Sequence, residues 1–193
     1  MHHIAKAVQV LKNGGIVIFP TDTAFGIGCR IDAAAAVKRL FTIRNRPETQ
    51  ATPVLISNLR MAEDFLQPVP QNVVEKLIEP YWPGALTIVL YCKTDKVPSL
   101  VRGGREMHGV RIPDHMTTLS IIDGVGVPIL GPSANFHGGK TPYRYEDLDP
   151  ELVKLVDYVV PGECYRKEAS TVIDTTVTPW EIIRQGAVEV ENL

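Results

Sequence analysis

Three short clusters of hydroxyl, amide and guanidinium side chains have the residue types that bind an anionic ligand. The first is Thr21-Asp22-Thr23, the second is the turn Arg44-Asn45-Arg46-Pro47, and the third is Ser133-Ala134-Asn135, which closes an apolar run. Each cluster follows a strand-like or helix-like segment, and open α/β sheets gather their ligands at the carboxyl ends of strands. The clusters therefore predict one shared site for a phosphate-bearing substrate.

The arginines in and near these clusters allow more than one interpretation. A guanidinium donates two parallel hydrogen bonds to a phosphate or carboxylate, so Arg44 and Arg46 can converge on one anion, but they can also be a solvated surface pair. Arg111 interrupts the apolar run between Val110 and Ile112 and must find a partner there. That partner is either a structural ion pair or a ligand carboxylate.

Several other chemistries are disfavoured by spacing. Gly139-Lys140-Thr141 resembles the end of a P-loop, but Ala134 stands where the loop needs its first glycine. Ser133 lies outside a G-x-S-x-G elbow, so we expect its hydroxyl to bind a ligand rather than to attack one, although Ser133 and Asn135 are also ordinary turn formers. The histidines lack H-E-x-x-H spacing, and no protein-held metal is expected.

Composition limits the class of protein. The 193 residues carry 20 basic and 22 acidic side chains, so no overall positive field would hold a nucleic acid, and any RNA contact must be local. The odd number of cysteines without a C-x-x-C pair favours a reducing compartment. No stretch approaches the roughly 20 apolar residues of a membrane span, and no signal-peptide core is present. We expect a soluble, cytoplasmic protein of one domain, 1–193.

Hydrophobic periodicity predicts alternating helices and strands. Helices are expected over 4–11, 33–43 with Asp32 as N-cap, 58–66, 72–78, near 115–122 and near 150–156. Strands are expected over 16–19, 54–57, 86–92, 108–112, 128–130, 157–160, 171–174 and 180–184. Residues 93–107 have the composition of a mobile loop and could form a lid. The pattern predicts one mixed α/β domain with a twisted open sheet, whose strand order periodicity cannot define.

Seven motifs, in order along nearly the whole chain, carry a family resemblance. They are 19–26 (FPTDTAFG), 44–47 (RNRP), 81–87 (YWPGALT), 109–113 (GVRIP), 132–135 (PSAN), 170–174 (STVID) and 183–187 (IRQGA). With these motifs the chain resembles the YrdC/Sua5/TsaC family of threonylcarbamoyl-AMP synthases. Its length is similar to the short, single-domain form, so we expect no additional C-terminal domain.

The resemblance implies a fold, a reaction and partners. The fold would be a YrdC-like α/β open sheet with flanking helices and a concave, positively lined face. The reaction would join L-threonine, bicarbonate or CO2, and ATP with Mg2+, giving threonylcarbamoyl-AMP and pyrophosphate. Partner proteins would then transfer the threonylcarbamoyl group to N6 of adenosine 37 in tRNA. Catalysis would be positioning and charge neutralisation, without a covalent intermediate or a protein-ligated metal.

The resemblance also assigns roles by motif position. The catalytic residues would be Arg44 and Arg46, on the ATP phosphates, with Ser133 and Asn135 on the nucleotide. Thr141, Tyr143 and Arg184 would be further nucleotide contacts. Arg111 would clamp the threonine carboxylate, and the rest of the threonine pocket would comprise Thr23, Phe25, Ser57 and Ser170.

Four departures from the family pattern concern this site. Arg44 stands where lysine is usual, and Phe25 stands where tyrosine is commoner. The turn 48–52 lacks its usual lysine, and 141–143 reads Thr-Pro-Tyr instead of Ser-Pro-Thr. Turnover or substrate selectivity could differ accordingly.

Two other functions are compatible with the same resemblance. A non-catalytic module of this fold could bind double-stranded RNA or tRNA, and such binding would weaken steeply with salt. An O-carbamoyl-transfer domain is the third option, but the zinc-finger and acylphosphatase-like segments that accompany it are missing from the sequence.

Overall fold

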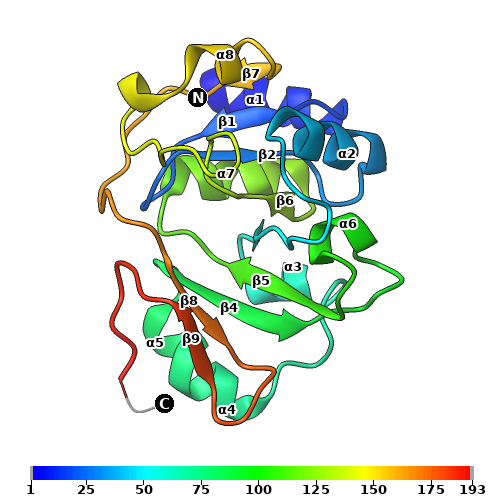
Figure 1. The fold of residues 1–193 in the computed structure, drawn as a ribbon, viewed down its shortest axis with the longest axis vertical. Helices are drawn as coiled ribbons and strands as arrows, with labels where there is room; N and C mark the ends of the chain where they lie inside the picture. The colour runs from blue at the N-terminus through cyan, green and yellow to red at the C-terminus, as the bar shows by residue number, and fades with distance from the viewer. Residues whose placement is uncertain (1, 192–193) are drawn as a thin grey trace.

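Two β-sheets form the frame of the molecule in the computed structural model, which describes residues 2–191 (Figure 1). The small sheet has the order β2-β1-β7, with β1 Val17–Phe19, β2 Gly26–Gly28 and β7 Tyr158–Val159. The large sheet has the order β6-β3-β5-β4-β8-β9, with the bounds β3 Val54–Leu55, β4 Leu86–Tyr91, β5 Met107–Arg111, β6 Ile129–Leu130, β8 Thr171–Asp174 and β9 Glu181–Arg184. Both sheets mix parallel and antiparallel pairs.

Single bridges join the two sheets. Gly26 pairs with Ser133, and Arg30 pairs with Ile129, so the strand β2 of the small sheet runs beside β6 of the large one. The mixed open α/β class predicted from the sequence is confirmed, with the sheet divided in two. The strand β2 was not predicted, because two of its three residues are glycines, which weaken the strand signal.

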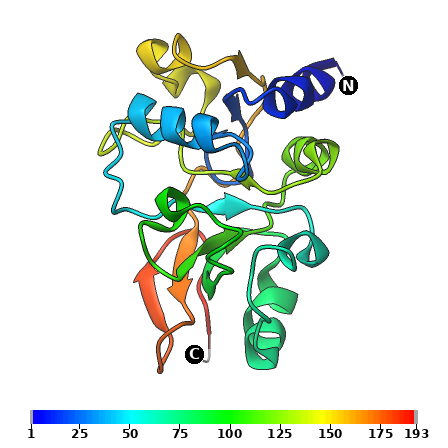
Figure 2. The same cartoon turned by 90° about the vertical axis from the view of Figure 1, so that its right-hand side faces the viewer.

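Helices cover the outer faces. Their bounds are α1 His2–Lys12, α2 Ala34–Ile43, α3 Leu59–Ala62, α4 Gln71–Val73, the π-helix η1 Val74–Ile78, α5 Glu79–Tyr81, α6 Ser99–Arg102, α7 Met116–Val125, the 3-10 turn η2 Tyr145–Asp147, and α8 Pro150–Val153. The elements α4, η1 and α5 continue one another and lie along one side of the large sheet (Figure 2). Residues of the large sheet that point away from these helices line the cavity described below.

The strand β4 shows how alternation creates these two sides. Leu86, Ile88 and Leu90 are buried in the main core together with Leu77 and Ile78 of η1. Successive side chains of a strand point to opposite faces, so Thr87 and Val89 face away from this core. The polar Thr87 is thereby presented on the side where the two sheets meet.

Three local predictions differ from the structure. The N-cap of α2 is Ala33 and makes no side-chain cap, because the Asp32 carboxylate instead accepts hydrogen bonds from Arg30 Nε at 2.9 Å and Nη2 at 2.7 Å. Residues 93–107 are mostly turns and bends, as predicted for a loop, but they also contain the four-residue helix α6 and bury Val97 and Val101 in the main core. The helix predicted over 58–66 is shorter, ending at Ala62 in α3.

None of the helices within residues 2–191 combines the length and apolar character that crossing a bilayer requires.

Candidate functional site

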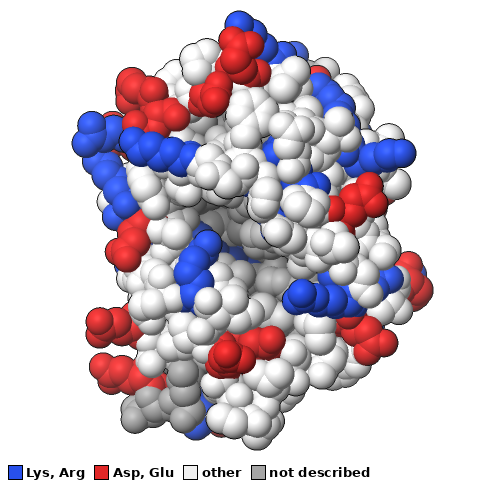
Figure 3. All heavy atoms as spheres, in the orientation of Figure 1, with Lys and Arg blue, Asp and Glu red and all other residues white. Residues whose placement is uncertain are grey.

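A polar cavity lies between the two sheets, and it is visible as a hollow with cationic side chains at its margin (Figure 3). Most of the residues predicted for the site line it: Thr23, Phe25, Arg44, Arg46, Arg111, Ser133, Thr141, Ser170 and Arg184. Arg111 and Arg184 lie on strands of the large sheet, and the others lie in connections, including the turn between β1 and β2 and the turn after α2. Within residues 2–191, no aspartate or glutamate is among the lining residues. The cavity is therefore cationic and rich in hydroxyls, as an anion site requires.

The turn after α2 places Arg44 and Arg46 together. Arg44 is the C-cap of the helix, and Asn45 has the left-handed φ of 51° that reverses the chain. Asparagine tolerates this conformation better than most residues. The reversal brings Arg46 back to the cavity that Arg44 also lines, and that the two bind one anion stays a prediction.

Arg44 is a buried cation with an unused donor. Its side chain is buried, with only 3% of the residue exposed, and Nε donates to the Asn135 carbonyl at 2.9 Å. Its Nη1 is buried and has no hydrogen-bond partner among residues 2–191. Burial, together with the charge of Arg46, lowers the pKa of Arg44 to about 10. An incoming anion would satisfy the donor and offset the repulsion between the two guanidinium groups.

Arg46 supports the neighbouring turn and still reaches the cavity. Its Nε donates to the Gln50 carbonyl at 3.2 Å, and its Nη2 donates to the Ala51 carbonyl. Burial lowers the pKa of Arg46. These contacts hold the turn 48–52 against the arginine although the turn lacks the family's lysine.

Ser133 and Asn135 have different positions although they are only two residues apart. Ser133 lines the cavity and donates to Asn135 Oδ1 at 2.6 Å. Asn135 does not line the cavity, and its Nδ2 donates to the Gly139 carbonyl at 2.6 Å. Asn135 therefore lies outside the cavity lining and forms hydrogen bonds with both Ser133 and Arg44.

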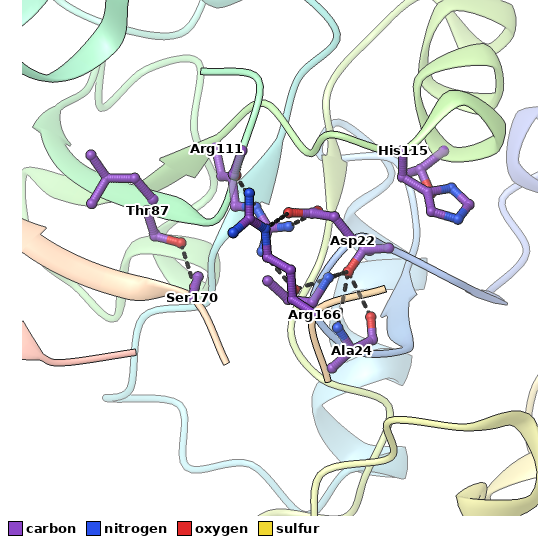
Figure 4. A network of polar contacts seen from close by, with 12 residues as sticks. Asp22, Ala24, Thr87, Arg111, His115, Arg166 and Ser170 are labelled. Carbon is purple, nitrogen blue, oxygen red and sulfur yellow. Dashed lines mark hydrogen bonds and ion pairs between the residues drawn. The ribbon is translucent and has the colours of Figure 1, made fainter. Parts of the chain in front are cut away.

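Arg111 is the last residue of β5, and its guanidinium is largely occupied by protein partners (Figure 4). Nε donates to the Gly84 carbonyl at 2.9 Å, Nη1 donates to Thr23 Oγ1 at 2.8 Å, and Nη2 forms an ion pair with Asp22 Oδ1. Burial lowers the pKa of Arg111, while the charge of Asp22 acts in the opposite direction. The structural ion pair left open by the sequence is present, and Arg111 nevertheless lines the cavity.

Another part of the cavity wall is built around Ser170. Its hydroxyl lies 2.9 Å from Thr87 Oγ1, and Arg184 Nη2 donates to its carbonyl at 2.7 Å and to its hydroxyl at 3.1 Å. Burial lowers the pKa of Arg184. Thr87 was not predicted as a site residue. The signal that could have found it is its place in the motif 81–87, at a position facing away from the core.

Two further predicted residues lie outside the cavity lining. Ser57 accepts a hydrogen bond from Asn58 Nδ2 at 3.1 Å and lies beside Met61. Tyr143 is part of the turn before η2, where its backbone N–H donates to Asp147 Oδ2 at 3.2 Å. Phe25, by contrast, is fully buried in the wall and packs edge-on against Tyr145 with ring centroids 6.1 Å apart.

Comparison with known proteins assigns the family. Residues 9–186 match the model of the Sua5, YciO and YrdC proteins, which is described as telomere recombination. The chain belongs to the Sua5/YciO/YrdC family. Within it, the chain is 36% identical over 158 residues to threonylcarbamoyl-AMP synthase of Bacillus subtilis, covering 80% of this chain and 45% of that protein.

Two other members of the family show how far the similarity extends. The crystal structure of Pyrococcus abyssi Sua5 complexed with L-threonine has a TM-score of 0.89 and 32% identity, covering 95% of this chain and 54% of that one. The uncharacterized Escherichia coli YciO is 26% identical over 189 residues, covering 97% of this chain and 91% of that protein. Its crystal structure superposes with a TM-score of 0.83, which shows a shared fold. The chain spans about half the length of the Bacillus subtilis and Pyrococcus abyssi synthases and most of YciO.

Proposed function

We propose that this chain is an L-threonylcarbamoyladenylate synthase, a nucleotidyltransferase that makes threonylcarbamoyl-AMP and pyrophosphate from L-threonine, bicarbonate or CO2, and ATP. The observation that carries this proposal is the buried Nη1 of Arg44 beside Arg46, which has no hydrogen-bond partner among residues 2–191, in a cavity that these residues line with hydroxyls and no carboxylate. The synthases among its relatives, and the L-threonine bound to Sua5, support the choice of substrates.

The proposed reaction needs little from the protein beyond position and charge. The amine of threonine adds to the carbon of CO2 and loses a proton, or it displaces the hydroxyl group of bicarbonate as water, and either route gives a carbamate. A carbamate oxygen then attacks the α-phosphorus of ATP, and pyrophosphate leaves. Guanidinium groups stabilise the charge that develops on the phosphoryl oxygens and on pyrophosphate. No side chain has to act as a covalent nucleophile.

The residues that line the cavity would have different roles. Arg44 and Arg46 would bind the phosphates, and Ser133, Thr141 and Arg184 would contact the nucleotide, with Asn135 acting through Ser133 and Arg44. The threonine pocket would comprise Thr23, Phe25, Arg111 and Ser170, which line the same cavity. Ser57 and Tyr143 would join the site only if a substrate extends beyond the cavity.

Magnesium would enter with the triphosphate. Residues 2–191 contain no group of three His, Cys, Asp or Glu side chains that could hold a metal ion. Mg2+ keeps several waters and binds readily to substrate phosphates, so Mg-ATP is the substrate in this proposal. The product would serve threonylcarbamoyl transfer to tRNA in the cytoplasm, through partner proteins.

The proposal is tested by pyrophosphate release. The purified chain is incubated with ATP and Mg2+, with L-threonine and bicarbonate each present or omitted, and the adenylate is detected by mass spectrometry. We expect release only when both are present. Arg44→Met should abolish most of it, whereas Arg39→Met should not, because Arg39 lies on the same helix but pairs with Asp157 outside the cavity.

Two results would contradict the proposal. One is a folded protein that binds Mg-ATP but makes no adenylate with both co-substrates present. The other is a protein that binds no nucleotide and instead binds RNA with a steep salt dependence, which would favour the RNA-binding alternative.

A further inference from the structure

Asp22 is a buried carboxylate directly behind the cavity wall. It lies in the turn after β1, has 1% of its surface exposed, and is not among the residues that line the cavity. Its Oδ1 is paired with Arg111, whereas its Oδ2 is buried and has no hydrogen-bond partner among residues 2–191. A buried carboxylate oxygen without a hydrogen bond is costly, so its retention calls for an explanation.

A second arginine approaches this unpartnered oxygen. Arg166 Nε lies 3.8 Å from Asp22 Oδ2, too far for a hydrogen bond but close enough for an ion pair (Figure 4). Asp22 therefore lies between Arg111, which faces the cavity, and Arg166, whose side chain is 44% exposed. The three groups together carry one net positive charge.

The chain that carries Arg166 holds it in place. Residues 160–170 connect β7 of the small sheet to β8 of the large one, along the left of Figure 1. In this connection the backbone N–H of Arg166 donates to the Asp22 carbonyl at 2.8 Å, and the ring of Tyr165 stacks on His115 with centroids 5.1 Å apart. The same connection continues into Ala169 and Ser170, which line the cavity. Arg166 is thus anchored to both Asp22 and the cavity wall.

We propose that Asp22 is a positioning residue that orients the guanidinium of Arg111 toward the carboxylate of an amino-acid substrate. Arg166, which pairs with the other oxygen of Asp22, would change how well Asp22 orients Arg111. Three of the five N–H donors of Arg111 are tied to Gly84, Thr23 and Asp22, so the plane of the guanidinium is defined before a ligand arrives. A preorganised guanidinium loses less freedom on binding. The net charge of one matches a single carboxylate and not a triphosphate. This inference rests on the proposed function.

The test separates threonine binding from nucleotide binding. We compare Asp22→Asn with the wild type by isothermal titration calorimetry, using L-threonine and ATP in separate titrations. Partners that orient a ligating side chain are typically worth 10–100-fold, so we expect L-threonine to bind at least about 10-fold more weakly. ATP affinity should stay within about 2-fold because the phosphate site is built from Arg44 and Arg46. In steady state, KM for L-threonine should rise more than kcat falls.

Matched variants exclude a merely structural effect. Asp32→Asn removes a carboxylate that also pairs with an arginine, Arg30, but outside the cavity, and it should bind both ligands as the wild type does. Asp22→Glu keeps the charge and should recover part of the loss. Arg166→Gln should weaken L-threonine binding by about 3-fold in the wild type and have no effect beside Asp22→Asn, which a double-mutant cycle measures.

The outcomes distinguish this inference from the proposed function. If the wild type binds ATP and L-threonine but Asp22→Asn binds L-threonine equally well, or loses both ligands equally, the positioning role is refuted while the proposed function stands. If Asp22→Asn does not fold, Arg166→Gln decides, and unchanged L-threonine affinity in that variant refutes the role. A wild type that binds no L-threonine overturns both.

Discussion

The buried charges of Arg111 and Arg44 are compensated differently, although both arginines line the same cavity. Arg111 is tied to Gly84, Thr23 and a compensating carboxylate, Asp22. Arg44 is held by Asn135, has Arg46 as its charged neighbour, and retains an unpartnered donor. Protein groups therefore compensate the charge of Arg111, whereas in our proposal an anionic ligand would compensate the charge of Arg44. The contrast is between an arginine whose orientation the protein defines before a ligand binds and an arginine whose remaining donor would be satisfied by a phosphate.

The strongest test of the contrast is the stability of Arg111→Met. Methionine keeps much of the side-chain volume but removes the ion pair with Arg111 and leaves the buried Asp22 with only Arg166, at 3.8 Å, as a charged partner. Breaking a buried pair from one side usually costs 3–5 kcal/mol, and we expect a loss of about that size in the free energy of unfolding. Urea denaturation monitored by tryptophan fluorescence measures it. A loss below about 1 kcal/mol would show that Asp22 finds other compensation.

The second test is Arg44→Met, where ligand affinity should change and stability should not. Removing a cation that lacks a carboxylate partner should alter the free energy of unfolding by less than about 1 kcal/mol. Because hydrogen bonds to charged groups are worth about 1.5–3 kcal/mol, pyrophosphate and ATP should bind roughly 10–100-fold more weakly. Arg44→Lys keeps the positive charge, and its affinity for pyrophosphate and ATP should lie between those of Arg44→Met and the wild type. Equal pyrophosphate affinity in Arg44→Met and the wild type would remove Arg44 from the phosphate site.

These two arginines also show what the sequence could and could not predict. The two-residue spacing left open whether Arg44 and Arg46 share one cavity, because the left-handed Asn45 that brings them to it leaves no clear signal in a single sequence. The alternatives for Arg111 could not be separated because its partner, Asp22, is distant along the chain. A partner 89 positions away is defined by tertiary structure and not by local pattern.

The same limit explains the other differences. The motif Ser133-Ala134-Asn135 suggested that both polar side chains face the ligand, but Asn135 turns back toward Gly139. The glycines of 93–107 suggested a loop, yet Val97 and Val101 are buried in the core, which depends on neighbours that periodicity cannot identify. By contrast, β8 was predicted at its observed bounds, 171–174, since its apolar pattern is local.

A third buried basic residue, His108, extends the comparison because it can lose its charge. It lies on β5, three residues before Arg111, with 2% of its surface exposed and with Nδ1 lacking a hydrogen-bond partner within residues 2–191. Burial lowers the pKa of His108 from 6.5 to about 4. His108 is therefore neutral at physiological pH. An arginine cannot avoid a buried charge in this way, because it stays protonated.

This neutral state predicts how stability depends on pH. Because the folded pKa lies below the unfolded value, the unfolded chain binds the proton more readily, and stability is complete above the unfolded pKa and declines as the pH falls toward 4. Between about pH 7 and about pH 5.5 we expect the free energy of unfolding to drop by about 1 kcal/mol. His108→Gln should lose this share of the slope while His115, whose pKa burial also lowers, keeps its own. Urea denaturation at both pH values measures the slopes, and identical slopes in His108→Gln and the wild type would mean that folding does not lower the pKa of His108, which would contradict a buried, neutral imidazole.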